Sequence, residues 1–157
     1  MAKLQRSVVL LKPDALQRGY VGEIISRFEK KGLKLMGLKM MKLTDEILDQ
    51  WYIHHKEKPF FGDLKKFMMS TPIIAMLWEG LECIKTVRKL CGTTKGYEAE
   101  AGSIRGDFSM SGQYNIIHAS DSPESAQKEE KLIFKPQEVF DYDKGEYLWV
   151  YSLEERE

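Results

Sequence analysis

The stretch from Asn115 to Pro123 has the residue types best suited to chemistry. It places His118 between the apolar pair Ile116 and Ile117 and the dipeptide Ser122-Pro123. The apolar pair is typical of the end of a buried strand, and Ser followed by Pro is a strong helix N-cap and first turn. Because a helix start attracts phosphate, the imidazole there could attack a phosphoryl group. For an isolated histidine, a structural place at a strand end is the more common alternative.

A carboxylate on the following helix could orient this ring. Ala126, Glu129 and Ile133 share one face at helical spacing, so Glu129 can point inward beside His118. We expect Glu129 to accept a hydrogen bond from Nδ1–H, which leaves Nε2 free to attack. The alternative is that Glu129 is a solvated member of the charged run 128–131.

Several cations and aromatic residues could complete a nucleotide site. Lys12, Arg88 and Arg105 each follow a turn, a strand end or a loop from which they could reach a bound triphosphate. Tyr52 and Phe60 could clamp a planar base. Taken singly, Lys12 and Arg105 would most often be surface charges, and aromatic residues at helical spacing are more often core.

Length and charge limit the class of protein. The 157 residues suit a single domain spanning 1–157, and the 24 Lys and Arg balance 24 Asp and Glu, which argues against a dedicated nucleic-acid or membrane-surface protein. Cys83 and Cys91 are too far apart on one expected helix to bridge, and His54 and His55 should point to different sides of a helix, so no zinc site is expected. We expect a cytoplasmic protein, since no secretory or membrane-spanning segment is visible.

The hydrophobic pattern predicts an α+β domain. We expect a ferredoxin-like split βαβ fold (βαββαβ), in which an antiparallel sheet is covered by helices on one face. A helical hairpin at 45–69 is inserted between two strands, and 92–114 is a long loop with glycines. The expected strands are 8–11, 33–43, 73–78 and 115–117, the expected helices include 21–31, 84–91 and 123–133, and 134–157 is an irregular aromatic tail.

Taken together, eight motifs resemble the nucleoside diphosphate kinase family in order and spacing over nearly the whole chain. They are Lys12-Pro13-Asp14, Arg18-Gly19, Gly22-Glu23-Ile24, Arg27-Phe28, Pro59-Phe60-Phe61, Trp78-Glu79-Gly80, Ile104 to Phe108 and Asn115 to Glu124. The resemblance implies that His118 takes the γ-phosphate of a nucleoside triphosphate and passes it to a nucleoside diphosphate in a ping-pong reaction. Walker, Rossmann and protein-kinase motifs do not occur in the sequence.

The resemblance also implies the roles of other residues. Glu129 would position the imidazole, Ser120 would support the catalytic residues, and Lys12 would serve both catalysis and binding. The nucleotide would bring Mg²⁺ on its phosphates, so no protein metal site is expected. Residues around the phosphates, ribose and base would be Lys12, Tyr52, Phe60, Leu64, Arg88, Thr94, Arg105 and Asn115.

Departures from the family pattern lie mostly in the glycine-containing loop. Lys95-Gly96 stands in place of Asn/Asp-Pro, Gly112-Gln113 in place of Val-Gly, and Val87 in place of a commoner glycine. The family also implies a homo-oligomer, and we favour a hexamer over a tetramer. Two alternatives remain for the function: a ferredoxin-like nucleotide-binding regulatory module without turnover, and a histidine phosphocarrier that relays phosphate to proteins.

Overall fold

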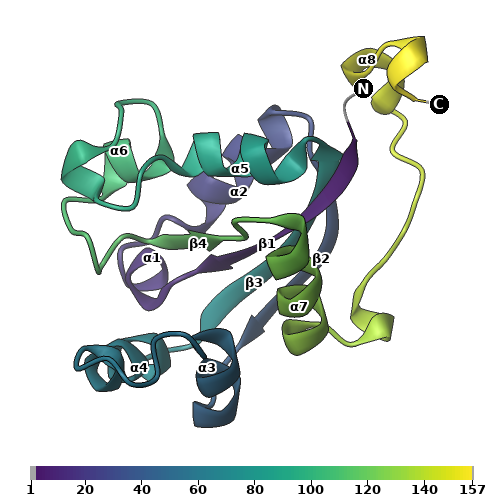
Figure 1. The fold of residues 1–157 in the computed structure, drawn as a ribbon. Helices are drawn as coiled ribbons and strands as arrows, with labels where there is room; N and C mark the ends of the chain where they lie inside the picture. The colour runs from purple at the N-terminus through teal and green to yellow at the C-terminus, as the bar shows by residue number, and fades with distance from the viewer. Residues whose placement is uncertain (1–2, 157) are drawn as a thin grey trace.

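Four antiparallel strands form one sheet in the order β2, β3, β1, β4 in this computed structural model, which describes residues 3–156 (Figure 1). The order confirms the predicted α+β ferredoxin-like fold. The strands are β1 Leu4–Leu11, β2 Lys34–Met41, β3 Ile73–Leu81 and β4 Ile117–Ala119. The helices are α1 Pro13–Gln17, α2 Val21–Lys30, α3 Asp45–Trp51, α4 Phe61–Met69, α5 Cys83–Cys91, α6 Ile104–Phe108, α7 Pro123–Ile133 and α8 Tyr147–Val150.

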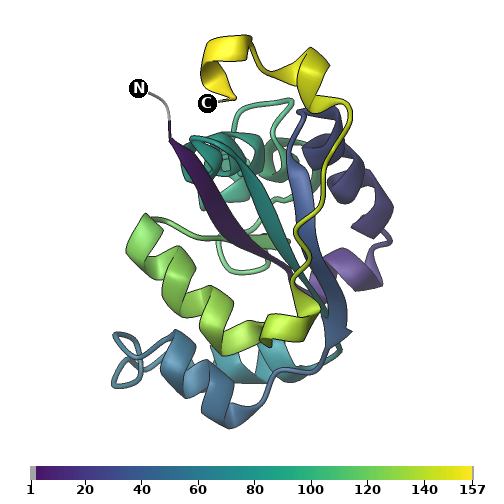
Figure 2. The ribbon, with the colours of Figure 1, turned by 90° about the vertical axis from the view of Figure 1, so that its right-hand side faces the viewer.

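Helices cover both faces of this sheet, so the expectation of helices on one face was wrong (Figure 2). In β1, Val9 and Leu11 join the core beneath α2 and α5, whereas Val8 and Leu10 join the core beneath α3, α4 and α7. The physical reason is the unbroken apolar run of β1. Successive side chains of a strand point to opposite faces, so a continuous run needs cover on both.

Local sequence signals define several elements as predicted. The Ser122 hydroxyl accepts a hydrogen bond from Ser125 N–H at the start of α7, and the Thr44 hydroxyl accepts one from Ile47 N–H at the start of α3. The expected irregularity near Gly37 is a register shift between Leu35 and Gly37 in β2. These side-chain caps and this glycine act over a few residues, which is why the sequence could predict them.

Three local expectations need correction. The last strand begins at Ile117, because Ile116 has a φ of 73° and leaves the extended conformation. Segment 92–114 is not a plain loop: it holds a 3₁₀ turn and α6. His54 and His55 lie in turns after α3 rather than on a helix, because α3 ends at Trp51.

Residues 134–142 run along the edge strand β2, and α8 lies beyond the end of the sheet (Figure 2). Phe140 N–H donates to the Met36 carbonyl, and the Tyr142 hydroxyl donates to the Leu35 carbonyl at 2.8 Å. The buried Lys34 ammonium pairs with the Asp141 carboxylate at 2.5 Å. The tail thus satisfies backbone groups of an edge strand, which are otherwise free to pair with other chains.

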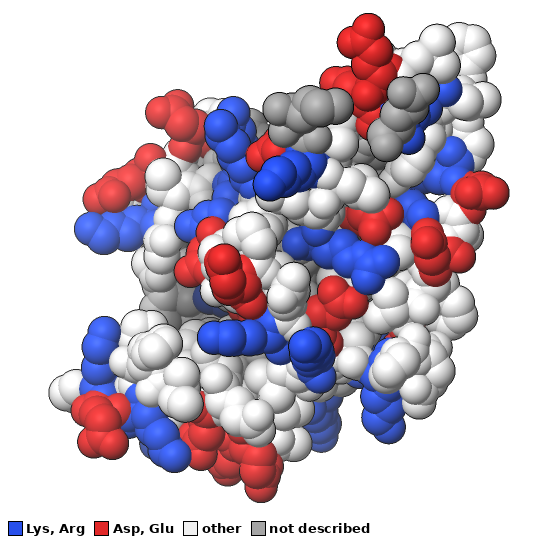
Figure 3. All heavy atoms as spheres, turned by 45° about the vertical axis from the view of Figure 1, so that its right-hand side comes forward, with Lys and Arg blue, Asp and Glu red and all other residues white. Residues whose placement is uncertain are grey.

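Positive and negative side chains are intermingled on the face drawn in Figure 3. The balanced sequence, with 24 residues of each sign, is thus also mixed on this surface. Within residues 3–156, no helix has the length and apolar character needed to cross a bilayer.

Gly106 provides a test of how tightly the loop is held. A Cβ placed there would lie 1.8 Å from the Glu100 carbonyl oxygen, whereas a Cβ at Gly62 in α4 meets nothing within 4 Å. We expect Gly106→Ala to lower the free energy of unfolding by roughly 1–3 kcal/mol through overpacking. Gly62→Ala, the matched control, should raise it by roughly 0.5–1 kcal/mol, since glycine is unfavourable inside a helix. Denaturant unfolding measures both, and equal stabilities would contradict the close approach.

Candidate functional site

His118 lies at the centre of the short strand β4, opposite Leu10 of β1. Its neighbours Ile117 and Ala119 point into the core beneath α2 and α5. Strand alternation therefore turns His118 to the opposite face, toward α3 and α7. The side chain keeps 22% of its surface exposed, so the ring is held by the protein and still open to a ligand.

Glu129 of α7 holds this imidazole at Nε2, with 2.8 Å between Nε2 and Oε2. The prediction that Glu129 faces the ring was made from helical spacing, but the predicted nitrogen was wrong. The direction from which α7 crosses β4 decides which edge of the ring meets the carboxylate, and spacing carries no such information. When the neutral ring keeps its proton on Nε2, Nδ1 retains the lone pair and is the nitrogen able to attack.

Ser120 connects this carboxylate to the sheet. Its hydroxyl donates to Glu129 Oε1 at 2.6 Å and accepts a hydrogen bond from Val8 N–H at 3.0 Å. Ser120 is fully buried, and its backbone N–H donates to the Val8 carbonyl. The glutamate therefore has both oxygens engaged, one by the serine and one by the imidazole.

The backbone just before the histidine is strained. Ile116, buried and β-branched, has a φ of 73°, which costs roughly 1–3 kcal/mol and persists only when neighbours enforce it. Asp14 Oδ2 accepts a hydrogen bond from Ile116 N–H at 3.0 Å, and Lys12 N–H donates to the Ile116 carbonyl at 2.8 Å. We did not assign Asp14 a role from the sequence, since nothing local indicates this contact across 102 positions.

Lys12 and Asn115 meet beside this turn. The buried Lys12 ammonium donates to Asn115 Oδ1 at 2.7 Å. Burial, and then the positive charge of Arg105, lower the pKa of Lys12 to about 8, while Asp14 opposes the shift. Lys12 is therefore a buried cation whose only side-chain acceptor among the described residues is a neutral amide, a state that a bound anion would stabilise.

Arg105 and Arg88 differ in how they are held. Arg105 is buried and donates to the carbonyls of Asn115, Gly92 and Ile117 at 3.2, 2.9 and 2.5 Å. It thus ties the 92–114 segment to β4, and burial lowers its pKa. Arg88 donates to the Ala119 carbonyl at 3.5 Å and lines a separate cavity of about 580 Å³ together with Asp121.

A cavity of about 340 Å³ gathers six of the predicted nucleotide-binding residues. Phe60 is 48% exposed, so a flat ligand can reach its ring. Burial, followed by the negative charge of Glu129, raises the pKa of Tyr52 to about 12, so its hydroxyl stays protonated at neutral pH. Neither Arg88 nor Arg105 lines this cavity. The lining is Lys12, Tyr52, Phe60, Leu64, Thr94, Gly112, Gln113 and Asn115.

Three loop residues that depart from the family pattern, Gly96, Gly112 and Gln113, have specific contacts in the structure. Gly112 and Gln113 belong to the cavity wall. Gly96 is buried, donates its N–H to the Ser111 carbonyl, and has no room for a Cβ, which would lie 2.3 Å from the Ser109 carbonyl oxygen. The glycine of Lys95-Gly96 therefore lets two parts of the loop approach closely.

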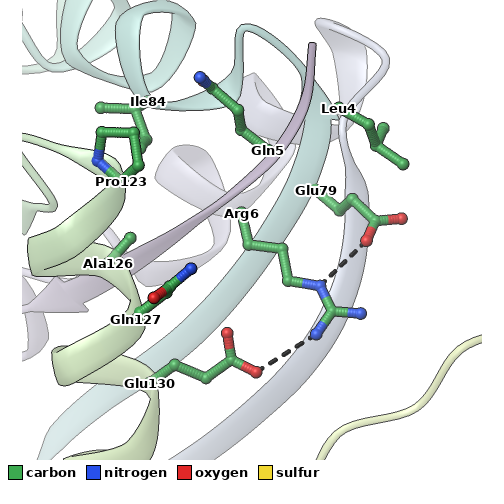
Figure 4. Close-up of a pocket in the computed structure, with 9 residues that line it drawn as sticks. All are labelled: Leu4, Gln5, Arg6, Glu79, Ile84, Pro123, Ala126, Gln127 and Glu130. Carbon is green, nitrogen blue, oxygen red and sulfur yellow. Dashed lines mark hydrogen bonds and ion pairs between the residues drawn. The ribbon is translucent and has the colours of Figure 1, made fainter.

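A third cavity, of about 390 Å³ and drawn in Figure 4, contains none of the predicted site residues. Arg6 of β1 pairs there with Glu79 of β3 at 3.0 Å and with Glu130 of α7 at 3.3 Å. These ion pairs join α7 to two strands. Consecutive residues of α7 thus have different partners, Glu130 with Arg6 and Glu129 with His118. Within residues 3–156, no group of three or more His, Cys, Asp or Glu is arranged to hold a metal ion.

Comparison with known proteins agrees with this arrangement. The family model described as nucleoside diphosphate kinase matches residues 5–139. A nucleoside diphosphate kinase of Parabacteroides distasonis is 53% identical over 152 residues, covering 97% of this chain and 99% of the relative. Human nucleoside diphosphate kinase B is 49% identical over 152 residues, covering 97% of this chain and all of the relative.

Solved structures give the same result. A halophilic nucleoside diphosphate kinase from Halobacterium salinarum, in complex with CDP, superposes with a TM-score of 0.92 at 39% identity. The match covers 96% of this chain and all of that one. A family protein from Babesia bovis gives a TM-score of 0.91 at 44% identity, over 94% of this chain and 99% of that one.

The lowered pKa of Lys12 predicts a pH dependence. Above about pH 8 the free protein loses the Lys12 charge, so kcat/KM for a nucleotide should fall as the pH rises through this value. Lys12→Arg should remove this alkaline decrease, because a guanidinium stays charged, although its different shape should lower the plateau. Steady-state rates between pH 6.5 and 9.5 measure the effect. An unchanged alkaline limb in Lys12→Arg would contradict the assignment.

Proposed function

This chain belongs to the nucleoside diphosphate kinase family and is a phosphotransferase of that kind, and we propose that His118 carries the phosphoryl group through its Nδ1 atom. The observation that carries the proposal is the hydrogen-bonded set of Ser120, Glu129 and His118. It fixes the ring at Nε2, and the ring packs on Trp51, whose neighbour Tyr52 lines the cavity.

The chemical step follows from this geometry. The Nδ1 lone pair forms a bond to the γ-phosphorus of a nucleoside triphosphate, and the bond from that phosphorus to the bridging oxygen breaks. The nucleoside diphosphate leaves with the electron pair of that bond. The Nε2 proton remains directed at Glu129, whose negative charge stabilises the positive charge that develops on the ring. A second nucleoside diphosphate attacks the phosphohistidine and reverses these steps.

The cavity supplies the nucleotide contacts in this proposal. The base stacks on the exposed Phe60 ring beside Leu64, while Tyr52, Thr94 and Asn115 contact ribose and phosphate. Lys12 neutralises phosphate charge, and the family resemblance gives Arg88 and Arg105 the same role, although neither lines this cavity. Stacking on an aromatic face tolerates every base, so broad nucleotide use is expected. The CDP complex of the Halobacterium relative supports nucleotide binding by this fold.

Magnesium fits this cavity as a companion of the nucleotide. No carboxylate is among the cavity-lining residues, so the lining suits phosphate and offers Mg²⁺ no charged protein ligand. Bound through phosphate oxygens and water, Mg²⁺ would neutralise part of the charge at the phosphates.

We also propose a single domain, a homo-oligomer and a cytoplasmic location. Exposed apolar side chains on β2 and the tail, among them Met40 and Trp149, support association of chains. The family resemblance favours a hexamer over a tetramer, and the mass of the particle in solution separates the two. Two buried free cysteines fit a reducing compartment.

Two alternative functions make different predictions. A nucleotide-binding regulatory module would bind without forming a phosphoenzyme. A histidine phosphocarrier would use His118 and would have no need of the base-sized cavity with Phe60 and Leu64. The Phe60 face therefore favours the kinase over the carrier.

The phosphoenzyme is the direct test. Incubation with Mg-ATP should give an acid-labile phosphoryl adduct that any nucleoside diphosphate discharges, and removing Mg²⁺ with EDTA should slow its formation. His118→Ala should give no adduct, whereas His54→Ala, a change at an exposed turn, should behave as the native protein. Radiolabel transfer measures both steps. An adduct that no nucleotide discharges would indicate the carrier, and no adduct in the native protein would indicate the binding module.

Glu129 should act on the nucleophile rather than on affinity. We expect Glu129→Ala to slow phosphoryl transfer roughly 10- to 100-fold, since a hydrogen bond to a charged group contributes about 1.5–3 kcal/mol. Nucleotide affinity should remain nearly unchanged. Glu130→Ala is the matched control, because its carboxylate faces Arg6. Single-turnover rates and equilibrium binding measure the two quantities, and an equal loss of binding would refute the role.

A further inference from the structure

The indole of Trp51 packs against the His118 ring from a second element of the fold. The two ring centroids lie 4.9 Å apart and the ring planes are inclined by 75°, an edge-to-face contact. Trp51 is the last residue of α3, and α3 lies beside α7 (Figures 1 and 2). The imidazole therefore has one neighbour from each of two helices, Glu129 from α7 and Trp51 from α3.

The two neighbours constrain different motions of the ring. The hydrogen bond from Nε2 to Glu129 fixes one atom, but a single hydrogen bond leaves the ring able to tilt about that atom. An aromatic ring packed edge to face limits this tilt, because tilting opens the contact. Attack on phosphorus requires the Nδ1 lone pair to lie along the line of the breaking bond, so tilt matters for the rate.

The same helical turn also forms the wall of the nucleotide cavity. Tyr52 follows Trp51 directly and lines the cavity, whereas Trp51 faces the histidine. Trp51 also packs on the core beneath α3, α4 and α7. The end of α3 is thereby fixed to the core, and its position sets both the cavity wall and the ring beside it.

We propose that Trp51 is a positioning residue, which holds the plane of the His118 imidazole so that Nδ1 faces the incoming phosphorus. This inference rests on the proposed role of His118 as the phosphoryl carrier. Trp51 does not line the nucleotide cavity, so in this proposal it acts only through the imidazole.

Rates in two Trp51 variants test the proposal. Trp51→Leu should lower the single-turnover rate of phosphorylation by roughly three- to tenfold, the range expected for loss of an aromatic pair, with little change in nucleotide affinity. Trp51→Phe should restore most of the rate, because a smaller ring can still present its edge. Trp149→Leu is the matched control, since Trp149 is 91% exposed and lies in α8. Native rates in Trp51→Leu, or equal losses in both Trp51 variants, would overturn the proposal.

Tryptophan fluorescence tests the contact between the Trp51 and His118 rings directly. Phosphorylation places negative charge close to the Trp51 indole, so emission of the native protein should change when ATP is added. Trp78 packs on Phe28 in the core beneath α2 and α5, and Trp149 lies in α8, so neither lies against His118 and neither should respond. The change should disappear in Trp51→Phe and in His118→Ala. A change that persists in Trp51→Phe, or its absence in a native protein that does become phosphorylated, would contradict the contact.

These experiments distinguish failure of the Trp51 proposal from failure of the proposed function. If no phosphoenzyme forms in the native protein, the proposed function fails. If the phosphoenzyme forms and Trp51→Leu reacts at the native rate, the function stands and the role of Trp51 is refuted. Thermal unfolding of each variant checks that a rate loss does not come from loss of the fold.

Discussion

The hydrogen bond between Glu129 and His118 Nε2 is the constraint on which the site depends. It joins α7 to β4, and Ser120 extends it to β1 through the Val8 backbone. A largely buried carboxylate, such as that of Glu129 with 14% of its side chain exposed, is costly unless its oxygens have partners, and here the imidazole and the serine hydroxyl supply them. The arrangement that satisfies the carboxylate therefore also selects the nitrogen left free for chemistry.

Strain beside the histidine is balanced by contacts from distant parts of the chain. Ile116 holds a left-handed conformation because Asp14 and the Lys12 backbone bind its peptide groups. Arg105 adds three hydrogen bonds from the 92–114 segment to carbonyls at Gly92, Asn115 and Ile117. Contacts on both sides hold this turn, so it should move little when a charged ligand binds. The turn is in this sense preorganised.

Helices α3 and α4, inserted between β2 and β3, form one wall of the cavity, and the 92–114 segment contributes to the other. Helices α3 and α4 bring Tyr52, Phe60 and Leu64 to one wall of the cavity, and the glycine-containing segment brings Thr94 and Gln113 to the other. The last turn of α3 meets both the cavity and the histidine, through Tyr52 and Trp51. The end of one short helix therefore connects the proposed nucleotide cavity with the proposed phosphoryl carrier.

The sequence alone determined the elements whose signals are local. Caps at Thr44 and Ser122 and the irregularity at Gly37 follow from interactions within a few residues, whereas helical spacing only allowed Glu129 to face inward. Only the tertiary structure decided that Glu129 meets Nε2, that Asp14 holds Ile116, and that Trp51 packs on His118. These contacts depend on how α3, α7 and the turn after β1 approach β4. Their geometry is set by packing between elements far apart in the chain, on which local spacing is silent.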